Sequence, residues 1–119
     1  MKKITVLTPT YNDSESIKET LTSLLNQSYT NWESIIIDDG STDNTKSIIE
    51  NFKKENNLEN KIKYIYQENK DQLNAILNGL DYISGDFVFV LHSDDLLPCN
   101  DFFEKIISFA EKSSYDALI

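Results

Sequence analysis

The chain has 119 residues, of which 39% are hydrophobic and only two are proline, so it has the length and composition of one folded domain. Its formal net charge of −9 argues against nucleic-acid binding, which would need Lys and Arg clustered on one face. An anionic ligand would therefore need another source of positive charge, and a bound divalent cation is the usual one.

The sequence has neither the pattern of a signal peptide nor a long apolar segment. The apolar stretch after Lys2 and Lys3 ends at Pro9, which is too short for a signal peptide, and Cys99 has no second cysteine for an internal disulfide. The longest apolar run, residues 87–91, is far below membrane-spanning length. We therefore expect no transmembrane segment and a soluble, cytoplasmic protein, either free or peripheral at the inner face of the membrane.

Short apolar runs that predict strands alternate with segments whose apolar residues recur at helical spacing. The predicted strands are residues 4–7, 34–37, 62–66, 87–91 and 117–119. The predicted helices include residues 17–25, 48–52, 73–83 and 102–110. This alternation predicts an α/β fold with a Rossmann-like, mostly parallel sheet flanked by helices.

Cap residues support the predicted helices. Ser16 and Glu19 fit a capping box before the first helix, and Asp43 or Asn44 is able to cap the second. Gly85 stands where a C-terminal cap of the third helix belongs.

No repeat or linker divides the chain, so we expect one domain over residues 1–119. Residues 87–91 are apolar on both faces, as in a central strand buried under helices. Because a strand begins again at Ala117, we expect the domain to continue past Ile119.

Polar residues follow three of the predicted strands, and in open α/β sheets ligands bind beyond these carboxyl ends. The segments are residues 8–12, 38–43 and 92–95. Two of them carry acid pairs, Asp38-Asp39 and Asp94-Asp95, which repel each other unless a cation or hydrogen-bond donors lie between them. A hard divalent metal held by one or two carboxylates and by substrate phosphates fits such a site.

The glycines limit how a phosphate group is bound. Only Gly40, Gly79 and Gly85 occur, so neither a dinucleotide-binding loop nor a P-loop can form. Each polar segment also has a structural interpretation, since residues 38–43 resemble a turn that enters a helix and Asp94-Asp95 fits a solvated loop. Their joint position at one sheet edge favours a functional site.

Four segments together resemble family 2 glycosyltransferases. Residues 4–12, 23–28 and 35–43 match motifs of that family in order and spacing, and residues 85–95 resemble its metal-binding segment. The resemblance covers essentially the whole chain. It implies an A-type glycosyltransferase fold that binds a nucleoside-diphosphate sugar together with Mn²⁺ or Mg²⁺.

The resemblance also implies roles for individual residues. The loop that holds the nucleotide base corresponds to Pro9, Thr10, Tyr11 and Asn12. Asp39 is expected to accept a hydrogen bond from a base ring N–H, with Asp38 beside it.

The family's Asp-x-Asp motif corresponds to His92-Ser93-Asp94. Asp94 is the expected metal ligand, and His92, in place of the first acid, is able to ligate Mn²⁺ or donate to phosphate. Ser93 and Asp95 are expected to bind the nucleotide sugar. Asp95 would contact either the ribose or the side chains that ligate the metal.

The stretch from Lys70 to Gly79 departs from the family pattern. Asp71 replaces a glycine, Asn74 an acid and Leu77 an asparagine. Lys70 and Asn74 are the two residues of this stretch that we assign to nucleotide-sugar binding.

The resemblance implies a metal-dependent, inverting glycosyltransferase that takes a sugar from a nucleoside-diphosphate donor, with UDP as the commonest nucleotide. The acceptor would be a hydroxyl group of a saccharide, of a lipid-linked molecule or of another compound. The reaction would belong to polysaccharide or cell-wall synthesis. The acceptor site and general base are expected after Ile119, so no catalytic residue is assigned. A module that binds nucleotide sugar without transfer is the main alternative. A Mg²⁺ phosphohydrolase fits less well, because its acidic loop would follow the first strand and carry a spacer between its acids.

Overall fold

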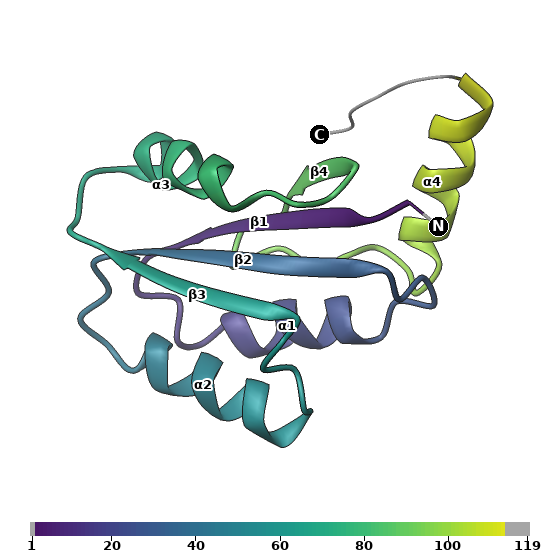
Figure 1. Ribbon diagram of the computed structural model, residues 1–119. Helices are drawn as coiled ribbons and strands as arrows, with labels where there is room; N and C mark the ends of the chain where they lie inside the picture. Colours follow the sequence, from purple (N-terminus) through teal and green to yellow (C-terminus); the bar gives the residue numbers. More distant parts are fainter. Residues whose placement is uncertain (1, 114–119) are drawn as a thin grey trace.

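The structure, a computed structural model, describes residues 2–113 (Figure 1). The elements in order are β1 (Ile4–Thr10), α1 (Ile17–Leu25), β2 (Trp32–Asp39), α2 (Thr45–Glu55), β3 (Ile62–Gln67), α3 (Gln72–Gly79), the 3₁₀ helix η1 (Leu80–Tyr82), β4 (Phe87–Val90) and α4 (Phe102–Ser113). The predicted alternation of strands and helices is confirmed. The predicted strand at residues 117–119 lies outside the described residues.

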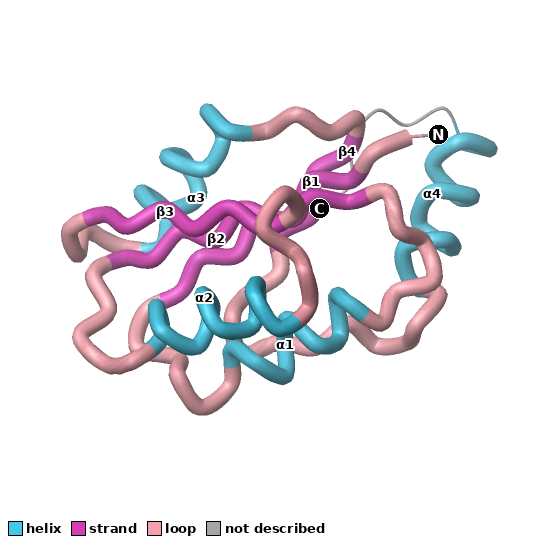
Figure 2. Tube along the Cα trace, turned by 60° about the horizontal axis from the view of Figure 1, so that its bottom comes forward, coloured by secondary structure: helices cyan, strands magenta, loops and turns pink. Residues whose placement is uncertain are grey.

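The four strands are all parallel and lie in the order β3-β2-β1-β4. Figure 2 shows α1 and α2 together on one face of this sheet, and α3 lies on the opposite face. Side chains of successive β1 residues point to opposite faces of the sheet. Val6 packs in the core under α1 and α2, whereas Leu7 packs beside Ala75 of α3. The predicted Rossmann-like sheet flanked by helices is therefore confirmed.

Strand β1 extends through Pro9, where the sequence predicted its end. The register runs from Ile4 opposite Trp32 to Thr10 opposite Asp38. The Leu7 carbonyl accepts from Leu91 N at 2.9 Å, on the β4 side, and residue 9 faces the same side. The next ladder bond on that side would run from the N–H of residue 9 to the Leu91 carbonyl, so Pro9, which has no N–H, coincides with the end of the pairing with β4 while β1 stays paired with β2.

The central position that the sequence predicts for β4 stays a prediction, because the chain after residue 113 lies outside the described residues. Within the described sheet it is an edge strand, and Val88, Phe89 and Val90 are only half-buried. The central positions belong to β1 and β2, and all seven residues of β1 are buried. An apolar run reports that a strand is covered, but it does not report how many neighbours the strand pairs with.

The predicted capping box at Ser16 is wrong. Ser16 is the N-cap residue of α1, but its hydroxyl makes no capping bond and donates to the Ser93 carbonyl at 3.1 Å. At the start of α2 the Asp43 carboxylate accepts from the N–H of Thr45 at 3.0 Å, whereas Asn44 makes no side-chain cap. Of the two cap candidates, Asp43 therefore satisfies the helix end.

Helix α3 is shorter than predicted and ends at Gly79, so Gly85 does not cap it. The Gly85 N–H instead donates to Thr5 Oγ1 at 2.8 Å, and a Cβ at position 85 would lie 2.6 Å from that oxygen. The close approach of these two chain segments therefore requires glycine. Leu73 and Leu77 of α3 are exposed, and the helix packs on the sheet through its small residues. No helix within residues 2–113 is long and apolar enough to cross a membrane.

Candidate functional site

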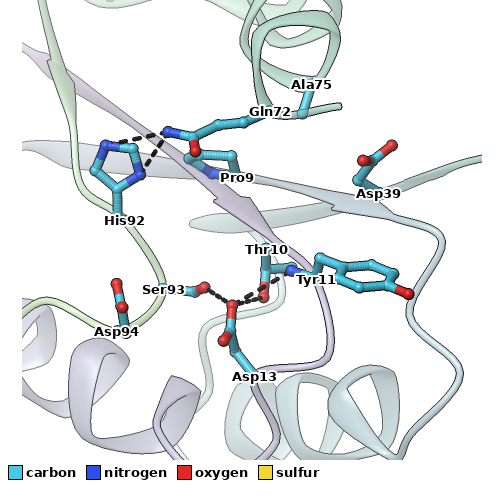
Figure 3. A pocket seen from close by; sticks show the side chains of 10 residues that line it. All are labelled: Pro9, Thr10, Tyr11, Asp13, Asp39, Gln72, Ala75, His92, Ser93 and Asp94. Carbon is cyan, nitrogen blue, oxygen red and sulfur yellow. Dashed lines mark hydrogen bonds between the residues drawn. The ribbon is translucent and has the colours of Figure 1, made fainter. Parts of the chain in front are cut away.

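A pocket of about 200 Å³ opens beyond the carboxyl ends of β1, β2 and β4 (Figure 3). It is lined by Pro9, Thr10, Tyr11, Asp13, Asp39, Gln72, Ala75, His92, Ser93 and Asp94. In Figure 3, Tyr11 and Asp39 lie on one side of the end of β1, and His92 and Asp94 lie on the other. The acids that follow β2 and β4 therefore meet at one sheet edge, where parallel strands direct them.

Asp39, the last residue of β2, forms one wall of this pocket and is 6% exposed. Its Oδ1 accepts from Gln67 Nε2 and from the backbone N–H of Lys70, each at 2.8 Å. Its Oδ2 has no hydrogen-bond partner within residues 2–113. Lys70 therefore contributes its backbone N–H to Asp39, and its side chain does not line the pocket.

Asp38 points to the opposite face of the strand from Asp39 and is buried. Its Oδ1 accepts from Ser41 N at 2.9 Å, and its Oδ2 accepts from the Tyr64 hydroxyl. Burial raises the pKa of Tyr64, and the hydrogen bond to the Asp38 carboxylate raises it further. Both oxygens of Asp38 are thus engaged within the protein, and the residue does not line the pocket.

Asn12 joins the loops that follow β1 and β2. It has φ of 51°, a left-handed conformation that asparagine tolerates better than most residues. Its side-chain oxygen accepts from Thr42 N at 2.8 Å and from Asp43 N at 3.3 Å, while its own N–H donates to Ser41 Oγ at 2.8 Å. Asn12 is therefore part of the frame around Tyr11, which is 46% exposed at the pocket.

Asp13 is a pocket residue that the sequence analysis missed. Its Oδ2 accepts from Thr10 Oγ1 and from Tyr11 N, each at 3.3 Å, and from the Ser93 hydroxyl. The residue could have been found by the rule that selected its neighbours, because it is an acid just beyond the carboxyl end of β1. Its contact with Ser93 spans 80 residues of chain and has no local sequence signal.

The segment after β4 brings His92, Ser93 and Asp94 to the pocket, but not Asp95. The His92 ring lies against Gln72 of α3, with 2.9 Å between Gln72 Nε2 and His92 Nδ1. Asp95 N–H donates to the His92 carbonyl at 3.0 Å, which closes a turn, and its side chain is exposed. Gln72, like Ala75, was not predicted from the sequence.

Asn74 does not line the pocket either. Its backbone N–H and its side-chain amide both donate to Asp71 Oδ1, at 2.7 and 3.0 Å, and this carboxylate caps α3. The replacement of glycine by Asp71 thus has a local structural role. It also turns the Asn74 side chain toward the start of its own helix.

Three carboxylates, those of Asp13, Asp39 and Asp94, line the pocket, and none of the described residues that line it is Lys or Arg. No group of three or more His, Cys, Asp or Glu side chains within residues 2–113 is arranged to hold a metal by itself. A Mg²⁺ or Mn²⁺ ion bound by one or two protein side chains takes its other ligands from substrate phosphates and water. The carboxylate and imidazole of Asp94 and His92 fit that type of site.

Comparison with known proteins identifies the family. The model of the family described as Glycosyl transferase family 2 matches residues 5–119. The chain is 37% identical over 99 residues to a GalNAc(5)-diNAcBac-PP-undecaprenol beta-1,3-glucosyltransferase of Campylobacter jejuni, covering 82% of this chain and 31% of that protein. It is 38% identical over 97 residues to a poly-beta-1,6-N-acetyl-D-glucosamine synthase of Staphylococcus aureus, covering 82% of this chain and 23% of that protein.

Solved structures agree. The S. aureus TarS 1–349 structure in complex with UDP matches with a TM-score of 0.82 and 30% identity, over 92% of this chain and 32% of that one. The mannosyltransferase PcManGT of Pyrobaculum calidifontis, in complex with GDP-Man and Mn²⁺, matches with a TM-score of 0.85 and 25% identity, over 92% and 32%. The chain thus spans about a third or less of the length of these relatives. Its fold is the A-type glycosyltransferase fold, and the chain belongs to glycosyltransferase family 2.

Proposed function

We propose that this chain is the donor-binding part of a metal-dependent, inverting glycosyltransferase that uses a nucleoside-diphosphate sugar, with UDP as the nucleotide. The observation that carries the proposal is the pocket itself. On one side of β1 it has Asp39, whose Oδ2 has no hydrogen-bond partner within residues 2–113, and on the other it has the side chains of His92 and Asp94. A relative solved with UDP and another solved with GDP-Man and Mn²⁺ support this assignment.

The nucleoside side of the pocket is proposed to bind the base. Asp39 Oδ2 would accept from a ring N–H of uracil, because Oδ1 is already occupied by two donors. Tyr11 would pack against the base, since it is exposed beside that carboxylate. Asp38 and Asn12 are proposed to hold the surrounding loops, which revises their expected role as direct contacts of the nucleotide.

The metal side is proposed to bind the diphosphate. Asp94 and His92 would hold Mn²⁺ or Mg²⁺, and the ion would supply the positive charge that stabilises the diphosphate as a leaving group. The need for it follows from charge, because three carboxylates without a Lys or Arg among the lining residues repel an anionic ligand. The side chains of Lys70 and Asn74, which were expected to contact the nucleotide sugar, do not line this pocket.

In the proposed reaction an acceptor hydroxyl oxygen attacks the anomeric carbon from the face opposite the diphosphate. A carbon–oxygen bond forms, the bond to the diphosphate oxygen breaks with its electron pair left on that oxygen, and the hydroxyl proton passes to a general base. The acceptor, a saccharide or a lipid-linked hydroxyl, and the base are proposed to belong to a part of the protein beyond these residues. The much greater length of the relatives is consistent with such a part.

A second candidate, a module that binds the nucleotide sugar without transfer, is favoured by one observation. Asn74, at a position where the family carries an acid, is bonded to Asp71 and turned away from the pocket. This candidate predicts donor binding with no consumption of UDP-sugar by the full-length protein. Release of UDP in the presence of acceptor would exclude it.

Calorimetry of UDP binding to the 119-residue chain tests the main proposal. We expect tighter binding with Mn²⁺ than with EDTA, and uridine binding that does not depend on the metal. Equal affinity for UDP with and without Mn²⁺ would refute the metal role. No UDP binding under either condition would refute the donor site.

A further inference from the structure

Helix α1 carries a buried polar stripe in addition to its apolar face. The stripe comprises Ser16, Thr20, Ser23 and Gln27, which recur at helical spacing along one side of the helix and just beyond its end. Thr20 and Gln27 are 1% and 4% exposed. Buried polar groups are costly unless they are hydrogen-bonded, so the partners of this stripe define its role.

All four residues of the stripe bond to one distant segment, residues 93–103, in chain order. Gln27 Nε2 donates to the Cys99 carbonyl at 2.6 Å, and Gln27 Oε1 accepts from Phe103 N at 3.0 Å. Ser23 Oγ accepts from Leu97 N at 3.2 Å. The side chains of the stripe thus hold the segment after β4 along one side of α1 through hydrogen bonds.

Thr20 acts at the part of this segment that enters the pocket. Its single hydroxyl proton is shared between two acceptors, the Ser93 carbonyl oxygen at 2.9 Å and the Asp95 carbonyl oxygen at 2.7 Å. These two carbonyls flank Asp94 on either side. The peptide group before Asp94 and the peptide group between Asp95 and Leu96 are therefore anchored to α1, and the backbone of Asp94 is held between these two points.

Two further contacts fix the same point. Ser16 Oγ donates to the Ser93 carbonyl at 3.1 Å, and the Ser93 hydroxyl donates to Asp13, which follows β1. Beyond Leu91, whose N–H still donates to the Leu7 carbonyl, the segment has left the sheet. Side-chain hydrogen bonds from α1 and its preceding turn therefore hold Asp94 in place.

We propose that Thr20 is a positioning residue for the metal half of the site, assisted by Ser16 and Asp13. This inference rests on the proposed function, in which Asp94 ligates the divalent ion. A carboxylate ligand must be held within a fraction of an ångström of its productive geometry, and groups behind it commonly set that geometry. Loss of the Thr20 hydroxyl should therefore weaken metal-dependent binding without reaching the nucleoside side.

The test compares Thr20→Val, which keeps the shape of the side chain, with Thr20→Ser, which keeps the hydroxyl. The matched control is Thr22→Val, because among residues 2–113 the Thr22 hydroxyl bonds to the Lys18 carbonyl of its own helix, at 2.7 Å, and not to the segment after β4. For each variant, calorimetry measures UDP with Mn²⁺ and uridine with EDTA, and thermal unfolding measures Tm. In Thr20→Val the Asp95 carbonyl loses this donor, while the Ser93 carbonyl keeps Ser16 Oγ. Loss of a group that orients a metal ligand typically costs about 10- to 100-fold in metal affinity, so we expect a loss of that size in Mn²⁺-dependent UDP affinity.

The expected pattern is that this loss is confined to Thr20→Val, with uridine binding retained and with Thr20→Ser and Thr22→Val close to wild type. Wild-type UDP affinity in Thr20→Val, or an equal loss for UDP and uridine, would overturn the positioning role. If Thr20→Val does not fold, Ser16→Ala provides the same comparison at a half-buried position and should shift UDP but not uridine. Absence of a Mn²⁺ effect in the wild type would instead refute the proposed function.

Discussion

Replacement of Asp39 by asparagine should reverse the preference of the pocket for the base. The backbone N–H of Lys70 is a fixed donor at 2.8 Å from Oδ1, so the asparagine must keep its carbonyl oxygen at that position. Its NH₂ group then occupies the position of Oδ2 and faces the pocket. A donor would thus replace the acceptor that uracil requires.

The magnitude follows from the burial of this carboxylate, which is 6% exposed. In such a place a donor that faces another donor loses its hydrogen bond without compensation from water. The cost is about 1–3 kcal/mol, which corresponds to a loss of about 5- to 150-fold in uridine affinity. Cytidine has an acceptor at ring N3 where uridine has an N–H, so its affinity should stay constant or rise in Asp39→Asn.

Calorimetry with uridine and cytidine in EDTA measures this reversal without involving the metal. Asp38→Asn is the matched control, because both oxygens of Asp38 are bonded inside the protein to Ser41 and Tyr64. That variant should lower Tm and leave the ratio of the two affinities unchanged. The reasoning is refuted if Asp39→Asn loses uridine and cytidine binding equally, or if it melts early and the ratio stays constant.

Three further substitutions test other parts of the structure. Asp94→Asn should remove the Mn²⁺ dependence of UDP binding in calorimetry and leave uridine binding intact; retained dependence would exclude Asp94 as a ligand. Gly40→Ala should lower Tm and weaken uridine binding, because Gly40 has φ of +86° and a Cβ there would lie 2.9 Å from the Asn69 backbone nitrogen. An unchanged Tm would contradict the expected backbone strain. Burial raises the pKa of Glu33, but hydrogen bonds from Ser84 and neighbouring groups outweigh it and hold the pKa below its ordinary value. The stability that ionised Glu33 contributes is therefore present above its unfolded-state pKa and is lost as pH falls through the folded-state pKa. Glu33→Gln should therefore lower the free energy of unfolding at neutral pH and lower it less in acid. Urea unfolding that shows the same difference between variant and wild type at both pH values would count against this.

The order of the elements and the edge of the sheet that carries the site could be predicted from sequence, because both depend on local pattern. Apolar runs and helical spacing located the strands and helices, and the rule for parallel sheets placed Asp39 and Asp94 together. The strand ends could not be predicted, because they depend on which neighbour each strand pairs with. Pro9 illustrates this, since β1 continues through it in pairing with β2, whereas the pairing with β4 ends before it.

The errors share a physical cause. Ser16 has the local pattern of a cap, but a carbonyl 77 residues away competes for its hydroxyl. Leu77 fits a helical stripe by spacing, but it is 52% exposed, because α3 lies on the sheet through Ala75. Asp13 was missed because its value for the site comes from Ser93, which only the folded chain brings near.

The polar stripe of α1 has a consequence for the order of folding. The partners of Thr20 and Gln27 lie 72 to 76 residues later in the chain. Until those partners arrive, α1 cannot bury its polar side without leaving hydrogen-bonding groups unsatisfied, and contacts of such long sequence separation form slowly. The polar side of α1 is therefore fully satisfied only when residues 93–103 are in place, so the side of the pocket that carries Asp94 depends on contacts that span most of the chain.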